Sequence, residues 1–255
     1  MTASRPWVLA ESTWATVRAA KYEVAILPWG ATEAHNTHLP YATDTVQSER
    51  VAIESARLAW ERGAKVVVLP AVPFGVQTGQ RELPLCLNAN PSTQALLLRD
   101  LAETVAASGV RKLVVLNGHG GNDFKQMIRE LQGVVPLLVC QVNWYQAVDP
   151  KPFFTHPGDH AGELETSVMQ HLTPDHVAPL GEAGPGKVRP SRVKAFNEGW
   201  AWTPRRWVEV TADTGVGDPA GATPAKGATY FAAACDKLAG FLVELAGADP
   251  SALYT

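Results

Sequence analysis

Residues 23–44 read Glu-Val-Ala-Ile-Leu-Pro-Trp-Gly-Ala-Thr-Glu-Ala-His-Asn-Thr-His-Leu-Pro-Tyr-Ala-Thr-Asp. The segment Glu23–Pro28 is almost uniformly apolar, which is typical of a strand covered on both faces of a sheet. Similar short apolar runs occur at Lys65–Pro70, Lys112–Leu116 and Leu137–Val142. We therefore expect four buried strands.

Helix-like segments separate or follow these runs. Apolar residues recur at helical spacing in Thr45–Gly63, Pro91–Gly109 and Asp123–Leu131, and a final helix is expected over Pro224–Leu245. Because strands and helices alternate along the chain, the sequence predicts an α/β fold. Its central sheet should be mostly parallel, with helices on both faces.

Composition and net charge limit the classes of protein to which this chain can belong. The 255 residues are 46% hydrophobic and 18% charged, as in a globular protein, and we expect a single domain over residues 1–255. A formal net charge of −3 argues against nucleic acid as the main partner and leaves a small molecule as the expected one. Three cysteines lack metal-type spacing, and no apolar run suits a membrane span or a secretion signal. These features predict a cytoplasmic protein without a membrane partner.

Carboxylates and imidazoles gather directly after the first expected strand. Glu33, His35, His38 and Asp44 occupy this segment, and both side-chain types are ligands of zinc, manganese and iron in catalytic sites. Glu33 and His35 are two residues apart, so in an extended loop they point to the same side and can each reach one of two metal ions. Asp44 follows a proline-containing turn, where its carboxylate can bridge two ions. His38 is a ligand, a substrate contact or a group that orients the loop.

A glycine-rich turn, Asn117-Gly-His-Gly-Gly-Asn122, follows the third expected strand. One interpretation is a phosphate-binding turn that opens a helix, but the segment matches neither the dinucleotide fingerprint nor the P-loop motif. We favour the alternative, in which the glycines let the backbone pass close to a metal centre and His119 supplies a ligand.

A third cluster, His160-Ala-Gly-Glu-Leu-Glu-Thr-Ser, brings an imidazole close to two carboxylates. If a helix begins at Glu163, Glu165 can turn back toward His160 and fix its tautomer, which suits general acid–base catalysis. The alternative is that Glu163 and Glu165 are carboxylates favoured by the helix dipole. All three clusters come after expected strands, where α/β enzymes place their sites.

Candidate substrate contacts lie near these clusters. Trp144, Tyr145 and the tryptophan-bearing loop 200–207 are candidates for the walls of a pocket, and the alternative places them in the core or at a subunit interface. His156 is a candidate for the pocket mouth. Residues 181–224 are rich in Gly and Pro without clear periodicity, and we interpret them as a functional or interface loop.

These motifs resemble those of the creatininase family of metal-dependent amidohydrolases. Residues from Gly30 to Asp44 are similar to that family's Gly-x-x-Glu-x-His-x-x-His-Leu-Pro-x-x-Thr-Asp signature. Residues 117–122 and 160–167 are similar to its second and third motifs. Weaker likeness at Pro73-Phe-Gly and at 215–227 extends the resemblance over nearly the whole chain.

The resemblance implies a three-layer α/β/α sandwich, and hexamers built from dimers. It also implies that His160 transfers protons while Glu165 holds it. The metal ligands that it implies are Glu33, His35, Asp44 and His119, with Asp44 bridging. We expect two divalent ions per subunit. A mixed carboxylate and imidazole site accommodates zinc, manganese and iron, and zinc is the metal we expect first.

Two departures separate this chain from the creatinine-hydrolysing members of the family. Those members carry a carboxylate ligand two residues after the second-motif histidine, where this chain has Gly121. Either Glu163 takes over that role or the second metal binds weakly. Residues 153–159, before His160, also lack the tryptophan that those members use as part of a lid. Creatinine is therefore not the expected substrate.

We expect a hydrolase that cleaves the C–N bond of an amide, expected to be cyclic, in a small polar substrate. Hydroxide held by the metal ions would attack the carbonyl, and His160 would protonate the leaving nitrogen. One alternative keeps the metal site but opens the ring of a keto-inositol or lactone-like substrate. The other is a non-catalytic binder of a nucleotide or small molecule at residues 112–131.

Overall fold

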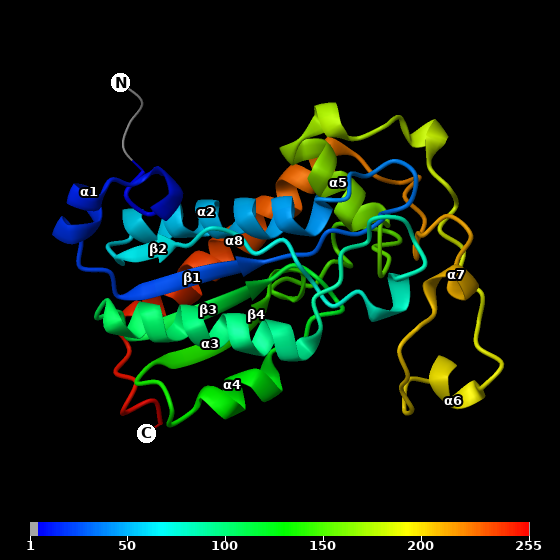
Figure 1. Ribbon diagram of the computed structural model, residues 1–255. Coiled ribbons are helices and arrows are strands. Elements are labelled where there is room, and N and C mark those ends of the chain that lie inside the picture. Colours follow the sequence, from blue (N-terminus) through cyan, green and yellow to red (C-terminus); the bar gives the residue numbers. More distant parts are fainter. Residues whose placement is uncertain (1–4, 255) are drawn as a thin grey trace.

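The computed structural model describes residues 5–254, and Figure 1 shows how their helices surround a central sheet. In this part of the chain four strands pair in parallel, in the order β2-β1-β3-β4. They are β1 (Val24–Trp29), β2 (Val66–Val68), β3 (Lys112–Asn117) and β4 (Leu138–Asn143). All four predicted strands are confirmed, with ends that shift by one or two residues.

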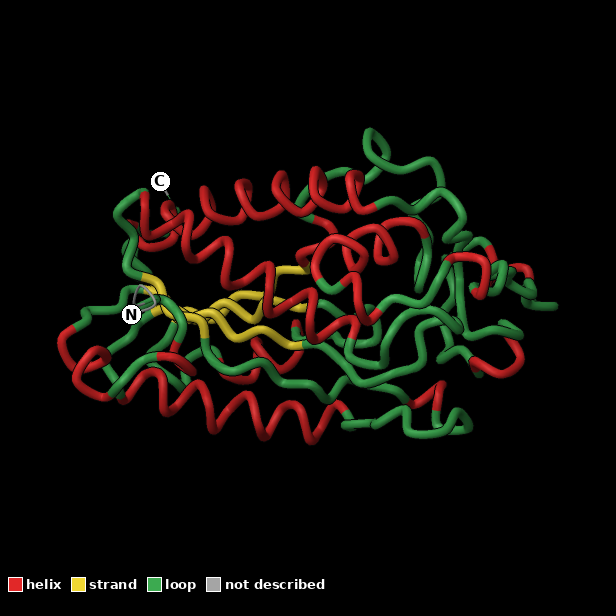
Figure 2. The backbone as a smooth tube through the Cα atoms, turned by 90° about the horizontal axis from the view of Figure 1, so that it is seen from above, coloured by secondary structure: helices red, strands yellow, loops and turns green. Residues whose placement is uncertain are grey.

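Helices cover both faces of this sheet, which confirms the predicted three-layer α/β/α arrangement. Figure 2 shows the strands running between the long helices. A short helix, α1 (Trp14–Ala19), precedes β1. The first face carries α2 (Thr43–Glu61), α5 (Glu163–Leu172) and α8 (Pro224–Gly247), and the second carries α3 (Pro91–Ala107) and α4 (Lys125–Leu131).

The strands are apolar throughout because successive side chains enter two different cores. In β1, Val24 and Ile26 pack toward α2 and α8, whereas Ala25 and Leu27 pack toward α3. This alternation follows from the period of two in a strand. A strand covered by helices on both faces therefore has no polar face, which is why the uniform apolar pattern predicted the layers correctly.

Two of the long helices end at glycines in the left-handed region. Gly63 follows α2 with φ +96°, and Gly109 follows α3 with φ +82°, so both predicted helix ends are confirmed. The start of α2 lies two residues before the expected one. It begins at Thr43, and this places Asp44 in the first turn.

Irregular chain and short helices lie on the side of the sheet where the carboxyl ends of β1 and β3 meet. The segment that follows α5 contains α6 (Lys194–Asn197) and α7 (Trp207–Val210), seen at the right of Figure 1. The 3₁₀ turn at Thr78–Gln80 lies beside α7. Among residues 5–254, no helix has both the length and the hydropathy needed to cross a bilayer.

Helices α5 and α8 cross at a glycine, which gives a test of this packing. A Cβ added to Gly227 would lie 1.9 Å from the main-chain oxygen of Ser167, and backbone cannot move aside. We therefore expect Gly227→Ala to lower the free energy of unfolding by about 3 kcal/mol. Gly240, in the same helix, has open space at its Cβ position, so Gly240→Ala should raise stability by up to about 1 kcal/mol. Equal urea midpoints for the two variants would contradict this account.

Candidate metal centre

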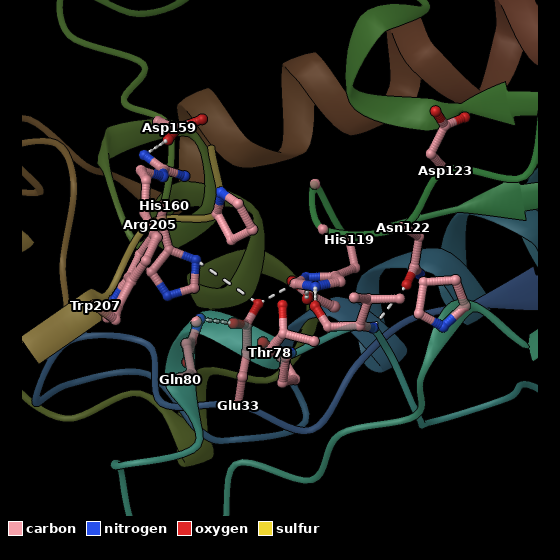
Figure 3. Close-up of a pocket in the computed structure, with 18 of the residues that line it drawn as sticks. Glu33, Thr78, Gln80, His119, Asn122, Asp123, Asp159, His160, Arg205 and Trp207 are labelled. Carbon is pink, nitrogen blue, oxygen red and sulfur yellow. Dashed lines mark hydrogen bonds and ion pairs between the residues drawn. The ribbon is translucent and has the colours of Figure 1, made fainter. Parts of the chain in front are cut away.

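Three imidazoles and three carboxylates converge beyond the carboxyl ends of β1 and β3. They come from the loop after β1, the first turn of α2, the turn after β3 and the start of α5. One of them, His160, lies three residues before α5 begins. Figure 3 shows Glu33, His119 and His160 of this cluster around one cavity. The cluster consists of Glu33, His35, Asp44, His119, His160 and Glu165.

One group of donors centres on His119. Its Nδ1 lies 2.8 Å from Glu33 Oε1 and 3.0 Å from Asp44 Oδ2. Zinc binds nitrogen and oxygen at about 2.0–2.2 Å, so the ligand atoms of one ion stand roughly 3 Å apart. Glu33, Asp44 and His119 therefore have the spacing of three ligands of a single cation.

A second group of donors shares Asp44 with the first. His35 Nε2 lies 3.0 Å from Asp44 Oδ1, while the other carboxylate oxygen faces His119. One ligand atom each from His35, Asp44 and Glu165 lies within 4.8 Å of the others. The two oxygens of Asp44 therefore face two different donor groups, as a bridging carboxylate requires.

Each imidazole in the cluster uses one ring nitrogen on a main-chain carbonyl. His35 Nδ1 lies 3.1 Å from the oxygen of Glu33, and His119 Nε2 lies 3.1 Å from that of Val76. His160 Nε2 lies 2.8 Å from the oxygen of Ala34. A carbonyl only accepts, so these nitrogens donate, and in the neutral rings the opposite nitrogen has a free lone pair. Such carbonyl partners orient metal-binding histidines.

The carboxylates also leave acceptor atoms unused. Glu33 accepts a hydrogen bond from Gln80 at Oε2, but its buried Oε1 accepts none from the described residues. The buried Oδ2 of Asp44 likewise accepts none. Buried carboxylate oxygens without partners are costly unless a cation coordinates them. The donor set therefore fits divalent metal ions.

Burial disfavours charge in this cluster, but attraction between opposite charges overrides it at His35, Asp44 and His119. Burial alone would lower the pKa of His35, but Asp44 and Glu33 raise it to about 10. Burial also opposes ionisation of Asp44, yet His35 and His119 hold the pKa of its carboxyl below the usual range. At Glu165, by contrast, burial raises the pKa to about 7. The carboxylate of Asp44 thus stays ionised next to positive charge.

His160 lies at the edge of the cluster. Its Nδ1 lies 3.8 Å from Glu33 Oε1, and its ring stands edge to face with Trp207 at 5.3 Å between centroids. Its backbone is paired with Val216, which fixes the position of the residue. Burial and then the charge of His35 lower its pKa. The lowered pKa favours the neutral ring, and Nδ1 faces the carboxylate of Glu33.

The structure does not bring Glu163 into this cluster. Its buried carboxylate pairs with Lys226 and accepts a hydrogen bond from the main-chain nitrogen of His156 at 2.7 Å. Glu165 occupies the cluster instead, and among residues 5–254 no hydrogen bond or ion pair joins it to His160. The interaction that orients His160 is the one with the Ala34 carbonyl.

Gly121, where creatinine-hydrolysing members carry a ligand, has no room for a side chain. A Cβ at this position would lie 2.4 Å from His119 Nε2 and 2.5 Å from the oxygen of Val76. Those two atoms form the hydrogen bond that orients His119. A carboxylate at this position would therefore disrupt the hydrogen bond that orients His119.

The residues predicted as individual substrate contacts lie outside the cavity lining. Trp144 is buried in the core, with its ring 6.1 Å from that of Tyr230, and Tyr145 packs against the same core. His38 is buried and its Nε2 contacts the Thr166 hydroxyl at 2.8 Å, so it supports the first turn of α5. His156 is exposed, and its main chain contacts Glu163.

The cluster opens into a cavity of about 800 Å³. Its walls are residues 76–80, the turn 119–123 and residues 202–207. Trp202 and Trp207 line it, which agrees with the tryptophan-bearing loop as a pocket wall, whereas Trp200 does not. Sequence analysis missed Gln80 and Arg205, because neither belongs to a motif and only the folded chain brings them here.

A parallel α/β sheet with a buried carboxylate and imidazole cluster at its carboxyl edge defines a protein with a metal-binding catalytic centre. The family model described as Creatininase, creatinine amidohydrolase, matches residues 10–242. The chain belongs to the creatininase family, whose members are metal-dependent amidohydrolases, and it is a hydrolase of that family.

Similar proteins share both the sequence and the fold. A mycofactocin precursor peptide peptidase of Mycobacterium tuberculosis is 32% identical over 222 residues, covering 83% of this chain and 81% of its own. A crystal structure from Bacteroides fragilis, provisionally described as a creatinine amidohydrolase, is 45% identical with a TM-score of 0.93, and covers 99% and 100% of the two chains. A two-zinc form of a creatininase variant has the same fold, with 23% identity, a TM-score of 0.74, and 93% and 97% coverage.

Proposed function

We propose that this chain hydrolyses the C–N bond of an amide in a small polar substrate, with two divalent ions, zinc or manganese. The observation that carries this proposal is the pair of donor groups that share Asp44. Glu33, Asp44 and His119 would hold one ion, and His35, Asp44 and Glu165 the other. When bound, such ions lower the pKa of water and polarise a carbonyl.

His160 is the proposed proton-transfer residue. The bond from its Nε2 to the Ala34 carbonyl fixes the tautomer, so Nδ1 is the atom that accepts a proton at the cluster. Because its pKa is lowered by burial, the ring stays available as a base. The protonated ring would then donate from Nδ1 to the leaving nitrogen of the amide. Oε1 of Glu33, a proposed metal ligand whose other oxygen accepts from Gln80, lies 3.8 Å from this nitrogen.

The cavity supports a substrate larger than one small ring. Its volume of about 800 Å³ lies in the range of roughly 300–1,000 Å³ that holds drug-sized ligands. The M. tuberculosis relative is named as a peptidase of a precursor peptide. We therefore include short peptides among the candidate amides, alongside the cyclic amides expected from sequence.

A substrate panel tests this function directly. Protein stripped with a chelator and reloaded with zinc or manganese would be assayed against cyclic amides, short peptides and keto-polyols, with the stripped protein as control. We expect hydrolysis of the substrate, detected as a released amine or a new amino terminus, with the reloaded protein and not with the stripped protein. Turnover confined to keto-polyols would replace the amide proposal with ring opening. Tight nucleotide binding without metal dependence would replace it with a binding function.

Two glutamates two residues apart in α5 offer a matched test of the second donor group. We expect Glu165→Gln to reduce bound metal from about two ions to about one, because one of three ligands loses its charge. Glu163→Gln should keep both ions, since its carboxylate faces Lys226. Elemental mass spectrometry on both variants measures the difference. The opposite pattern would assign the ligand role to Glu163.

A further inference from the structure

Residues 202–207, here called the 202–207 strap, form one wall of the cavity. The strap carries Trp202, Arg205 and Trp207 toward the same space as the metal-binding cluster. In Figure 3 Arg205 and Trp207 stand beside His160, while Asp123 lies at the far side of the view. The strap therefore borders the place where a substrate would reach His160.

Two contacts hold the strap in place, one made by the main chain of Arg205 and one by the side chain of Arg206. A Cβ on Gly79 would lie 2.0 Å from the main-chain oxygen of Arg205, so the two backbones are in direct contact. Arg206 donates two hydrogen bonds of 2.7 Å to the two carboxylate oxygens of Glu82. This bidentate pair ties the strap to the chain that follows the Thr78–Gln80 turn. These contacts set the main chain at Arg205, from which its side chain extends toward Trp207 and Asp159.

The Arg205 guanidinium is stacked one aromatic ring away from His160. Its carbon lies 4.5 Å from the centroid of the Trp207 ring, and that ring lies 5.3 Å from the imidazole of His160. Trp207 is itself buried and donates from Nε1 to the oxygen of Thr214 at 2.9 Å. A group bound by Arg205 would consequently lie on the side of the cavity where Trp207 contacts His160.

Arg205 is also distinguished by its charge. Among the described residues that line the cavity it is the one Lys or Arg. Nη1 donates to Asp159 Oδ2 at 2.7 Å, and the guanidinium makes no other hydrogen bond to the described residues. Four of its five N–H donors therefore remain for a ligand. The lining carboxylates are Glu33, Asp44, Asp123, Asp159 and Glu165.

We propose that Arg205 binds a carboxylate of the substrate, so that the substrates are short amides bearing a carboxylate close to the scissile bond. The planar fork of Arg205 matches a carboxylate in two hydrogen bonds. A dianionic phosphate fits less well, because five carboxylates surround the same cavity. This inference rests on the proposed function, since His160 defines where the reacting bond lies. Arg205 is a specificity-determining residue and takes no part in the chemical step.

Paired ligands test the proposal by binding alone. N-acetyl dipeptides, each prepared as the free acid and as the C-terminal carboxamide, would be titrated calorimetrically into metal-loaded protein. We expect the wild type to prefer the acids by roughly tenfold, as a charge-assisted pair provides. Arg205→Gln should abolish the preference while leaving carboxamide binding unchanged. Arg205→Lys, which keeps the charge but not the fork, should show an intermediate preference.

A control variant and defined contrary results make the outcome decisive. Arg192→Gln removes an exposed arginine of the same irregular segment that does not line the cavity, and it should retain the full preference. A preference that survives in Arg205→Gln would show that the acids bind to the metal ions, and would overturn the proposal. Equal binding of acids and carboxamides by the wild type, or no binding of the acids at millimolar concentration, would overturn it too.

Hydrolysis of the same pairs separates this inference from the proposed function. If the enzyme cleaves acids and carboxamides equally well, the amide hydrolase stands and the role of Arg205 falls. If the acids bind through Arg205 and none of the panel is cleaved, the carboxylate site stands and the amide hydrolase falls.

Discussion

Asp44→Asn is expected to lower kcat/KM for hydrolysis by about a thousandfold or more, because both donor groups lose their shared ligand. The two oxygens of this carboxylate lie 3.0 Å from His35 Nε2 and 3.0 Å from His119 Nδ1. An asparagine has the same shape but one weak acceptor and no charge. Bound metal measured by elemental mass spectrometry should fall with the activity, from about two ions per chain to less than one.

An exposed carboxylate is the control for that experiment. Asp100 lies on the outer side of α3, and Asp100→Asn should retain both metal and activity. Thermal unfolding of each variant in the presence of a chelator would show that the fold persists without metal. An Asp44→Asn protein that keeps two ions and full activity would disprove the shared-ligand role.

His160→Ala should lower kcat by about 10²- to 10⁴-fold, which is the usual contribution of a positioned acid or base. In contrast to Asp44→Asn, this variant should keep its metal, because His160 does not belong to either proposed ligand set. Its imidazole ends at the edge of the cluster, with Nδ1 3.8 Å from Glu33 Oε1. The separation of activity from metal content is the signature that distinguishes a proton-transfer residue from a ligand.

Added imidazole and a surface histidine complete the test. Imidazole diffusing into the space left in His160→Ala should restore part of the lost kcat. The exposed His176 lies outside the cavity lining, and His176→Ala should behave as the wild type. Loss of bound metal in His160→Ala would instead make this histidine a ligand, as its grouping with Glu33 and His35 permits.

The sequence predicted the layers and the location of the site because both follow from short-range rules. Uniformly apolar runs separated by helical periodicity specify a buried parallel sheet. Polar residues directly after such strands must meet at its carboxyl edge. These rules place Glu33, His35 and His119 at one edge of the sheet, where the structure groups them.

The choice between Glu163 and Glu165 could not be made in this way. The two residues are separated by about 200° around a helix, so only one can face the cluster. Which one does so depends on how α5 is rotated against the sheet, and that rotation is set by its packing on α8. The sequence also could not decide whether Trp144 and Tyr145 line the pocket or the core, because their core partner Tyr230 lies far along the chain in α8. The single-domain organisation and the hexamer stay predictions.

The proposed metal ligands and the outer cavity wall belong to parts of the chain that tolerate amino-acid substitution to different degrees. The metal-binding side chains extend from strand ends and helix starts that the two cores fix, so substitutions near them disturb the whole fold. The 202–207 strap belongs to a segment of short helices and largely exposed residues, where sequence drift costs little stability. Evolution could therefore redirect this scaffold to new substrates by altering the strap alone, with the reactive centre carried unchanged from one lineage to the next.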